Sequence, residues 1–203
     1  MRILVIDSSI RENSKTRMVL NRFLAEMNNN RDIEIDTIYL NNNPYLMPLN
    51  DCLLAKRDSD CYNKRFDDDY YCFAKKLKSC DALVIAAPFY DLCFPTILKC
   101  FIEQTLVYNL TFVDDEFGVK GIINCKKLIY LSVRGGVIND YNNVDIATPY
   151  LNGYKNMLGI KKFYTLSYSC IDYPELEKKL EEDIPLFYKK CLYEYNANNW
   201  LKM

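Results

Sequence analysis

The sequence predicts an α/β three-layer sandwich, in which helices cover both faces of a five-stranded parallel sheet of order 2-1-3-4-5. Short, continuously apolar runs, such as residues 3–6 and 82–87, are typical of strands buried on both faces of a parallel sheet. These runs alternate along the chain with longer segments whose apolar residues recur at helical spacing. The chain has 203 residues, half of them hydrophobic, which suits one core, so we expect a single domain over residues 1–203.

The first part of the chain holds two predicted strands and a helix between them. Residues 3–6 form the first strand, and Ser14 can cap a helix whose apolar positions recur over residues 18–27. Residues 33–40 alternate between apolar and polar, which suits a strand near the sheet edge. Residues 41–64 show no sustained period. We expect a long loop there, of the kind that is usually functional or part of an interface.

The middle of the chain continues the alternation. A helix is predicted over residues 66–79 and the third strand over residues 82–87. Pro95 suits the first position of the next helix, where a backbone N–H has no partner within the helix in any case. Residues 111–119 predict a small exposed hairpin that turns at Gly118.

The last part of the chain completes the sheet. The predicted elements are, in order, a strand over 127–133, a helix that begins between 145 and 149 and ends at Gly159, a strand over 163–168, and a helix opened by Pro174. Pro185 lies inside that last helix and removes a backbone donor, so we expect it to kink or split the helix.

The charges of the chain nearly cancel, with 26 basic and 27 acidic residues. Nucleic acid requires a concentrated positive surface, so this balance argues against such a partner. No apolar run reaches the roughly 18 residues of a membrane span. The first residues turn acidic at Asp7, too soon for a signal peptide, so we expect a cytoplasmic protein with neither a nucleic acid nor a membrane as partner.

The nine cysteines form no C-x-x-C pair, and the chain contains no histidine. This pattern predicts ordinary reduced thiols, mostly buried, and no metal site. The absence of histidine also excludes hydrolysis of the Ser-His-Asp and Cys-His kinds. Any chemistry of this chain proceeds without an imidazole group.

Three polar or glycine-rich loops follow three of the predicted strands, and together they define one candidate site. They cover residues 8–16, 88–92 and 134–136, after the first, third and fourth strands. In an open parallel sheet, ligands bind outside the carboxyl ends of the strands, near the point where the strand order reverses. One loop suits a phosphate, one an aromatic ring and one a row of carbonyl groups. The set points to FMN.

The first loop has the composition of a phosphate site. Ser14 at a helix start places the free amides of Lys15 and Thr16 beside hydroxyl groups, and a helix amino terminus attracts a phosphate dianion. Ser9 adds a further hydroxyl, while Lys15 or Arg17 can add positive charge. The alternative is an ordinary helix cap. The position of the loop directly after the first strand favours phosphate.

The other two loops suit a flavin ring. Phe89 and Tyr90 can pack near the ring while backbone amides face its N5 edge. The alternative is that the two aromatic residues only cap the core, but that interpretation leaves Asp91 unexplained. The glycines of the third loop let backbone amides approach the pyrimidine carbonyls of the flavin. Preorganised donors there stabilise the negative charge that collects on reduction. The alternative is that the two glycines only form a turn. No catalytic side chain is predicted, because the cofactor carries the chemistry. The predicted cofactor-binding residues are Ser9, Ser14, Lys15, Thr16, Pro88, Phe89, Tyr90, Asp91, Leu92, Val133, Arg134, Gly135 and Gly136.

Short motifs spread over nearly the whole chain carry a resemblance to a known family; they lie at residues 8–9, 14–16, 86–91, 111–112, 133–136, 148–151 and 159–160. On these motifs the chain resembles the FMN-dependent NADH-azoreductases, also described as NADH:quinone oxidoreductases, of the flavodoxin-like fold. The resemblance implies a homodimer whose two sites lie near the subunit interface. It also implies that FMN is held by Ser9 and by residues 14–16, 89–92 and 133–136.

Four positions depart from the pattern of that family. Asp91 stands where asparagine is usual, Val133 where a hydroxyl residue is usual, and Lys15 where a neutral polar residue is common. Backbone amides carry much of the flavin binding, so these three changes are compatible with it. Asp114 stands where a tyrosine that helps to close the pocket is common, which bears on the choice of substrate.

The resemblance implies that NADH or NADPH gives a hydride to FMN, and that two electrons then pass to a quinone or azo acceptor. No G-x-G-x-x-G nicotinamide site is present, so we expect donor and acceptor to take turns over one flavin face, with ping-pong kinetics. A non-catalytic FMN electron carrier is the alternative, but its expected acidic face conflicts with a net charge of −1. A phospho-receiver domain would need an acceptor aspartate at the end of the third strand, where this chain has Pro88.

Overall fold

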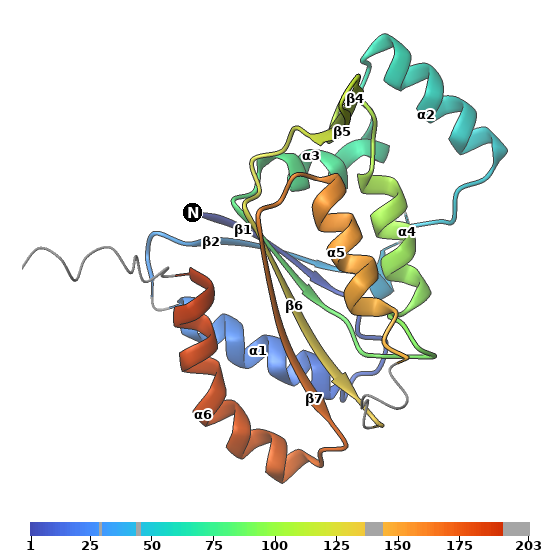
Figure 1. Cartoon of the computed structure of the whole chain (residues 1–203). Helices are drawn as coiled ribbons and strands as arrows, with labels where there is room; N and C mark the ends of the chain where they lie inside the picture. Colours follow the sequence, from blue (N-terminus) through green and yellow to red (C-terminus); the bar gives the residue numbers. More distant parts are fainter. Residues whose placement is uncertain (29, 44–45, 137–143, 193–203) are drawn as a thin grey trace, which may run out of the picture.

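A computed structural model describes residues 1–28, 30–43, 46–136 and 144–192, so the end of the predicted domain, residues 193–203, lies outside the described residues. Five strands form one parallel sheet in the order β2-β1-β3-β6-β7, which confirms the predicted order 2-1-3-4-5 (Figure 1). The strands of this sheet are β1 (Arg2–Asp7), β2 (Glu34–Tyr39), β3 (Ala82–Ala86), β6 (Lys127–Arg134) and β7 (Lys162–Ser169).

Helices cover both faces of the sheet, as the fold class requires. Helices α1 and α6 lie on one face, and α3, α4 and α5 lie on the other (Figure 1). Alternate side chains of β1 enter the two cores, with Val5 on the α1 side and Ile6 on the α4 side. The helices are α1 (Lys15–Asn28), α2 (Asp51–Asn63), α3 (Cys72–Ser79), α4 (Thr96–Thr105), α5 (Ala147–Met157) and α6 (Tyr173–Leu192), with short 3₁₀ turns η1 (Leu40–Asn42) and η2 (Asp69–Tyr71).

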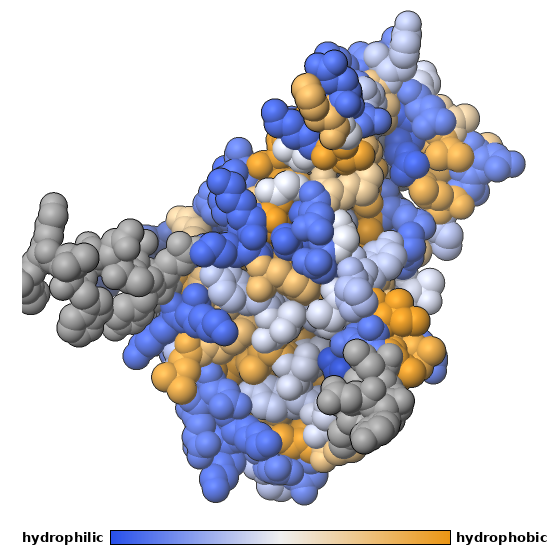
Figure 2. All heavy atoms as spheres, viewed as in Figure 1, coloured by the Kyte–Doolittle hydropathy of each residue, from blue (hydrophilic) through white to orange (hydrophobic). Residues whose placement is uncertain are grey.

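The loop predicted over residues 41–64 is wrong over its second half, which forms α2. Asn50 caps this helix by accepting the Leu53 amide at 3.0 Å, and Lys64 ends it in the left-handed conformation. Cys61 is the one residue of α2 that is buried, so the helix has no apolar stripe that periodicity could detect. Figure 1 shows α2 projecting from the body of the molecule, and Figure 2 shows mostly hydrophilic side chains over it.

One other helix differs from its prediction, and the last helix takes the first of its two predicted outcomes, a kink. The helix expected over residues 66–79 begins only at Cys72, because the Asp68 carboxylate caps the separate turn η2 by accepting the Tyr70 amide at 2.8 Å. Helix α6 runs on through Pro185 without splitting, and Figure 1 shows that it bends.

The hairpin predicted over residues 111–119 is present, but it extends to Gly121: β4 (Phe112–Asp115) and β5 (Gly118–Gly121) pair antiparallel, and Gly118 begins the second strand just after the turn. Its far end packs on the end of α5. A Cβ atom at Gly121 would lie 1.9 Å from the backbone carbon of Leu158, and Gly159, at φ 70°, turns the chain beside it. The two glycines therefore allow two backbones to touch at this point.

Candidate functional site

A pocket of about 570 Å³ lies at the carboxyl ends of β1, β3, β6 and β7, beside the point where the strand order reverses. The three loops predicted from the sequence meet there. Nine of the predicted residues line the pocket: Ser14, Lys15, Thr16, Pro88, Phe89, Tyr90, Val133, Arg134 and Gly135. The structure thus brings together segments that are more than a hundred residues apart in the chain.

The other four predicted residues lie next to the pocket without lining it. Ser9 is fully buried behind the first loop, and Gly136 is exposed beside its lining neighbour. Asp91 and Leu92 form the exposed tip of a turn. Asp91 lines an adjoining hollow that it shares with Arg11.

The amino terminus of α1 forms one end of the pocket. The Ser14 hydroxyl accepts the Arg17 amide at 3.3 Å, as a helix cap does. Lys15 and Thr16 follow in the first turn, where backbone N–H groups have no partner within the helix. The buried Thr16 hydroxyl accepts the Val133 amide at 3.2 Å, which leaves its own proton for another acceptor. This end of the pocket therefore presents several donors to an anion.

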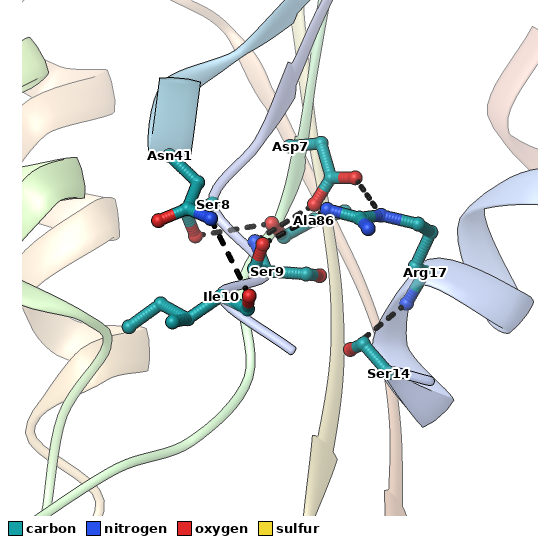
Figure 3. A network of polar contacts seen from close by, with 8 residues as sticks. All are labelled: Asp7, Ser8, Ser9, Ile10, Ser14, Arg17, Asn41 and Ala86. Atoms are coloured by element: carbon teal, nitrogen blue, oxygen red, sulfur yellow. Dashed lines mark hydrogen bonds and ion pairs between the residues drawn. The ribbon is translucent and has the colours of Figure 1, made fainter. Parts of the chain in front are cut away.

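A buried ion pair fixes the first loop from behind (Figure 3). The Asp7 carboxylate, which is fully buried, receives the Arg17 Nε at 2.6 Å and the Ser9 amide at 2.8 Å. Arg17 also donates from Nη2 to the Ser9 carbonyl at 2.9 Å, which closes a ring of contacts. The Ser8 hydroxyl donates to the Ala86 carbonyl at 3.1 Å and joins the loop to β3. Arg17, one of two candidates for a phosphate charge, is therefore engaged with Asp7.

Lys15, the other candidate, connects the first loop to the loop after β7. Its ammonium lies 2.5 Å from the Ile171 carbonyl oxygen and 4.8 Å from the centre of the Tyr173 ring. The Tyr173 hydroxyl donates to the Asn13 carbonyl at 2.7 Å. Because an ammonium carries three donors, Lys15 keeps capacity for a further acceptor in the pocket.

A tight turn follows β3. Tyr90 and Cys93 exchange two backbone hydrogen bonds, at 2.8 and 2.9 Å, around Asp91 (φ 47°) and Leu92 (φ 73°). Two successive positive φ values are the signature of a type I′ turn, in which asparagine, aspartate and glycine are usual. Leucine in this conformation costs about 1–2 kcal/mol. The Ile146 amide donates to the Leu92 carbonyl at 2.9 Å and helps to hold the strained residue in place.

The turn also determines which amides can face a ligand. The Phe89 amide donates to the Val133 carbonyl at 3.2 Å, and the Tyr90 amide is engaged within the turn. Of the amides predicted to face a flavin, these two are used by the fold itself. Those of Asp91 and Leu92 make no hydrogen bond within the part of the chain that the structure describes.

Arg134, the first residue of the third loop, reaches across to the second loop. Its guanidinium carbon stands 4.9 Å from the centre of the Phe89 ring, and Nη2 lies 3.3 Å from the Asp145 carboxylate. Asp145 in turn accepts the Thr148 amide at 3.0 Å and so caps the start of α5. One arginine thus links the aromatic loop, the glycine loop and a helix terminus.

Some polar groups in the wall of the pocket and behind it lack partners. Within the described residues, the hydroxyls of Ser9 and Ser132 and the Nε of Arg134 are buried without a hydrogen bond, although buried polar groups normally have one. At Gly135 and Gly136, a Cβ atom would meet no chain atom within 4 Å. The packing of the chain itself does not require glycine there, so these positions leave room for a bound molecule.

Sequence reasoning missed one wall of the pocket. The missed lining residues are Arg11, Asn13, Cys170, Ile171, Asp172 and Tyr173. Cys170, Ile171 and Asp172 form the loop after β7, and Tyr173 begins α6. The rule that ligands gather at the carboxyl ends of strands was the available signal, because it applies to the fifth strand as to the others.

Two further kinds of feature were sought across the described part of the chain. It contains no group of three or more His, Cys, Asp or Glu side chains that could hold a metal ion. No helix within it is both long and apolar enough to cross a membrane.

The sheet order and the loop-lined pocket define a doubly wound α/β protein with its site at the switch point. The chain belongs to the flavodoxin-like family, since a sequence model described as "Flavodoxin-like fold" matches residues 1–185. It is 30% identical over 191 residues to the FMN-dependent NADH:quinone oxidoreductase of Clostridium perfringens. The aligned residues cover 90% of this chain and 94% of that protein. The resemblance drawn from the sequence motifs is thereby confirmed.

Other relatives match over shorter segments or at lower identity. The enzyme of the same name from Vibrio vulnificus is 41% identical over 85 residues, which span 42% of this chain and only 43% of the relative. An FMN-dependent NADH-azoreductase from Bacillus anthracis, solved in complex with FMN, superposes with a TM-score of 0.79 at 17% sequence identity. The superposition covers 93% of this chain and 98% of the azoreductase chain. An NAD(P)H:quinone oxidoreductase from Methanothermobacter marburgensis gives 0.78 at 16% identity over 94% and 98% of the two chains.

Proposed function

We propose that this chain is an FMN-dependent oxidoreductase that passes two electrons from NADH or NADPH to quinones or azo compounds. The observation that carries the proposal is one pocket of about 570 Å³ with a helix amino terminus at one end and a glycine loop at the other. Its size lies in the range of small-molecule sites. The names of the relatives, above all the Clostridium perfringens enzyme matched over 94% of its length, point to the same activity.

The residues of the pocket fit FMN at both of its ends. The first-turn amides, the Thr16 hydroxyl and the Lys15 ammonium would hold the 5′-phosphate. The buried Ser9 hydroxyl is an unused donor behind the same loop. At the other end, Gly135 and Gly136 leave open space in which backbone amides can meet the pyrimidine carbonyls. The family pattern assigns these roles to the same positions.

FMN, when bound, supplies the redox chemistry by accepting a hydride and then releasing two electrons. The chain supplies position and electrostatics. Phe89 presents a ring whose other face is covered by the Arg134 guanidinium at 4.9 Å. The turn amides of Asp91 and Leu92 are the backbone donors left for a flavin edge. A cation and oriented amides near the ring stabilise the negative charge that reduction places on it.

The proposed kinetic scheme is ping-pong, with NAD(P)H and acceptor using the same face in turn. A broad pocket, with no separate nicotinamide motif in the sequence, supports this scheme. Initial rates measured at several fixed concentrations of menadione should give parallel reciprocal plots against NADH. Intersecting lines would show that both substrates bind at once and would contradict the scheme.

We further propose that the protein works as a homodimer in the cytoplasm, as the family resemblance implies. The assembly can be tested by analytical ultracentrifugation of the FMN-loaded protein across a range of concentrations. Sedimentation as a monomer at micromolar concentration would contradict the dimer without bearing on the pocket.

The first test of the activity is a spectrum. Protein incubated with excess FMN and passed over a desalting column should keep the flavin absorbance, and NADH should bleach it anaerobically. Retention of FMN without bleaching would favour the alternative, a non-catalytic electron carrier. Protein that stays colourless would overturn the cofactor assignment.

A matched pair of variants tests the phosphate end. Lys15→Met removes a charged donor, and hydrogen bonds to charged groups contribute about 1.5–3 kcal/mol, so FMN should bind about 10-fold to 100-fold more weakly. Riboflavin, which lacks the phosphate, should bind the variant and the wild type equally. Arg22→Met, at an exposed position of the same helix, is the control. Equal loss of affinity for both flavins would place Lys15 away from the phosphate.

A further inference from the structure

Two cysteines face each other at the amino-terminal edge of the sheet, opposite the edge that carries the pocket. Cys80 lies two residues before β3, and Cys125 lies two residues before β6. These strands are neighbours, with Ala82 paired to Lys127 in parallel register. Both cysteines lie just beyond the end of this ladder, in adjacent segments of the chain. Both side chains enter the same apolar core, on the α3–α5 side of the sheet.

Backbone hydrogen bonds hold the two segments side by side beyond the end of the ladder. The Asn124 amide donates to the Lys78 carbonyl at 3.0 Å, and the Lys126 amide donates to the Asp81 carbonyl at 2.9 Å. Neighbouring strands of a sheet lie about 4.8 Å apart. Disulfides join residues whose Cα atoms are about 4.4–6.8 Å apart. Residues on segments that are hydrogen-bonded in this way come within the range of a disulfide.

The two thiols interact directly within this core. A hydrogen bond between them raises the pKa of Cys80 and lowers that of Cys125, and burial opposes the change at Cys125. The Cys80 sulfur also lies 3.3 Å from the Leu77 carbonyl oxygen, and the Cys125 sulfur lies 3.3 Å from the Lys127 carbonyl oxygen. The residues are 3% and 1% exposed, so the pair is shielded from bulky reagents.

A small reagent still has a route to the pair. Cys80 forms part of the wall of a hollow of about 160 Å³ on the protein surface, beside Lys76 and Ser79. A molecule the size of hydrogen peroxide can enter such a space, whereas a protein partner or a glutathione-sized disulfide cannot follow it to the buried sulfur. Access through Cys80 makes this thiol the first that peroxide reaches, and its raised pKa makes that first step slow.

We propose that Cys80 and Cys125 form a reversible internal disulfide when the protein meets hydrogen peroxide. The Cys80 sulfur attacks one peroxide oxygen, the O–O bond breaks, and the thiol proton leaves with the second oxygen as water. The Cys125 sulfur then attacks the resulting sulfenic acid. The S–S bond forms as hydroxide leaves and takes the second thiol proton. One peroxide is reduced to two waters while two thiols are oxidised to one disulfide.

The test is a disulfide map of the folded protein. Wild-type protein is incubated with peroxide in native buffer, its free thiols are alkylated in denaturant, and it is digested with trypsin without reductant. Trypsin releases peptide 79–99, which carries Cys80 and Cys93, and peptide 121–126, which carries Cys125. We expect these two peptides to be linked, and the link to disappear on treatment with dithiothreitol.

Three variants make the assignment specific. Cys93→Ala should keep the linked peptide, whereas Cys80→Ala and Cys125→Ala should each abolish it. The exposed Cys52 and Cys170 report that the oxidant was active in the same sample. Oxidation of these exposed thiols with peptides 79–99 and 121–126 left unlinked would overturn the proposal. A link that forms only in guanidinium chloride, where the chain is unfolded, would overturn it as well.

Discussion

The buried pair of Asp7 and Arg17 offers a sharp test of how the first loop is held. The Asp7 carboxylate is fully buried, while the Arg17 side chain is 26% exposed. Replacing Arg17 with Met therefore leaves a buried carboxylate without its cation, and breaking a buried pair in this way costs about 3–5 kcal/mol. We expect a loss near the lower figure, because the Ser9 amide still donates to Asp7 at 2.8 Å.

The reverse change should be milder. Asp7→Asn removes the charge that the pair depends on, but the Asn oxygen can still accept the Ser9 amide, and Arg17 can turn towards water. We expect a loss of about 1.5–3 kcal/mol for this variant, the range of one hydrogen bond to a charged group. The double variant leaves no unpaired buried charge and should be more stable than Arg17→Met alone, so the two changes should not add.

The assay is unfolding in urea, followed by circular dichroism, with the melting temperature as a second measure. A loss of about 3 kcal/mol corresponds to about 6–12 °C for a domain of this size. The exposed Arg22→Met variant on the same helix is the control for loss of an arginine. If Arg17→Met unfolds at the same urea midpoint as that control, the ion pair does not stabilise the fold and the argument from burial is refuted.

Three further predictions concern other parts of the molecule. Gly121→Ala places a methyl group 1.9 Å from the Leu158 backbone and should lower the free energy of unfolding by about 1–3 kcal/mol, so an unchanged urea midpoint would contradict the backbone contact. Asp91→Asn removes an exposed carboxylate beside the pocket; a charge about 5 Å from a reduced ring would cost about 1 kcal/mol in water, so the midpoint potential should rise by about 20 mV, and potentiometry that shows no shift, or a fall, would refute it. A disulfide between Cys80 and Cys125 closes a long loop and should add about 4 kcal/mol to the stability without reductant, an effect that Cys80→Ala should remove.

The sheet could be predicted from the sequence because its strands are buried on both faces. All five residues of β3 are buried, so the sequence of this strand is an unbroken run of apolar residues. Helix α2 could not be predicted in the same way, since its one buried residue, Cys61, leaves no period to detect. Its boundaries are set instead by Asn50 and Lys64, and single capping residues are too common in loops to identify a helix alone.

The candidate site was predictable at the level of loops and less so at the level of atoms. The carboxyl-edge rule places residues 8–16, 88–92 and 134–136 together without knowledge of any side-chain geometry. It cannot tell that Arg17 turns to Asp7, because that choice depends on a carboxylate being buried behind the loop. Nor can it tell that the Phe89 amide is engaged within the fold, because its hydrogen bond goes to the Val133 carbonyl in a strand far along the chain.

The two ends of the pocket are held by different kinds of force, and this difference has a consequence for binding. The phosphate end rests on a buried ion pair and a helix cap, which are rigid and charged. The ring end rests on a turn in which Leu92 is strained, and such strain persists only where neighbouring contacts impose it. Under the proposed function, a change at Asp7 should therefore weaken FMN more than riboflavin although Asp7 does not line the pocket. A change at Leu92 should weaken both flavins equally, because both share the ring.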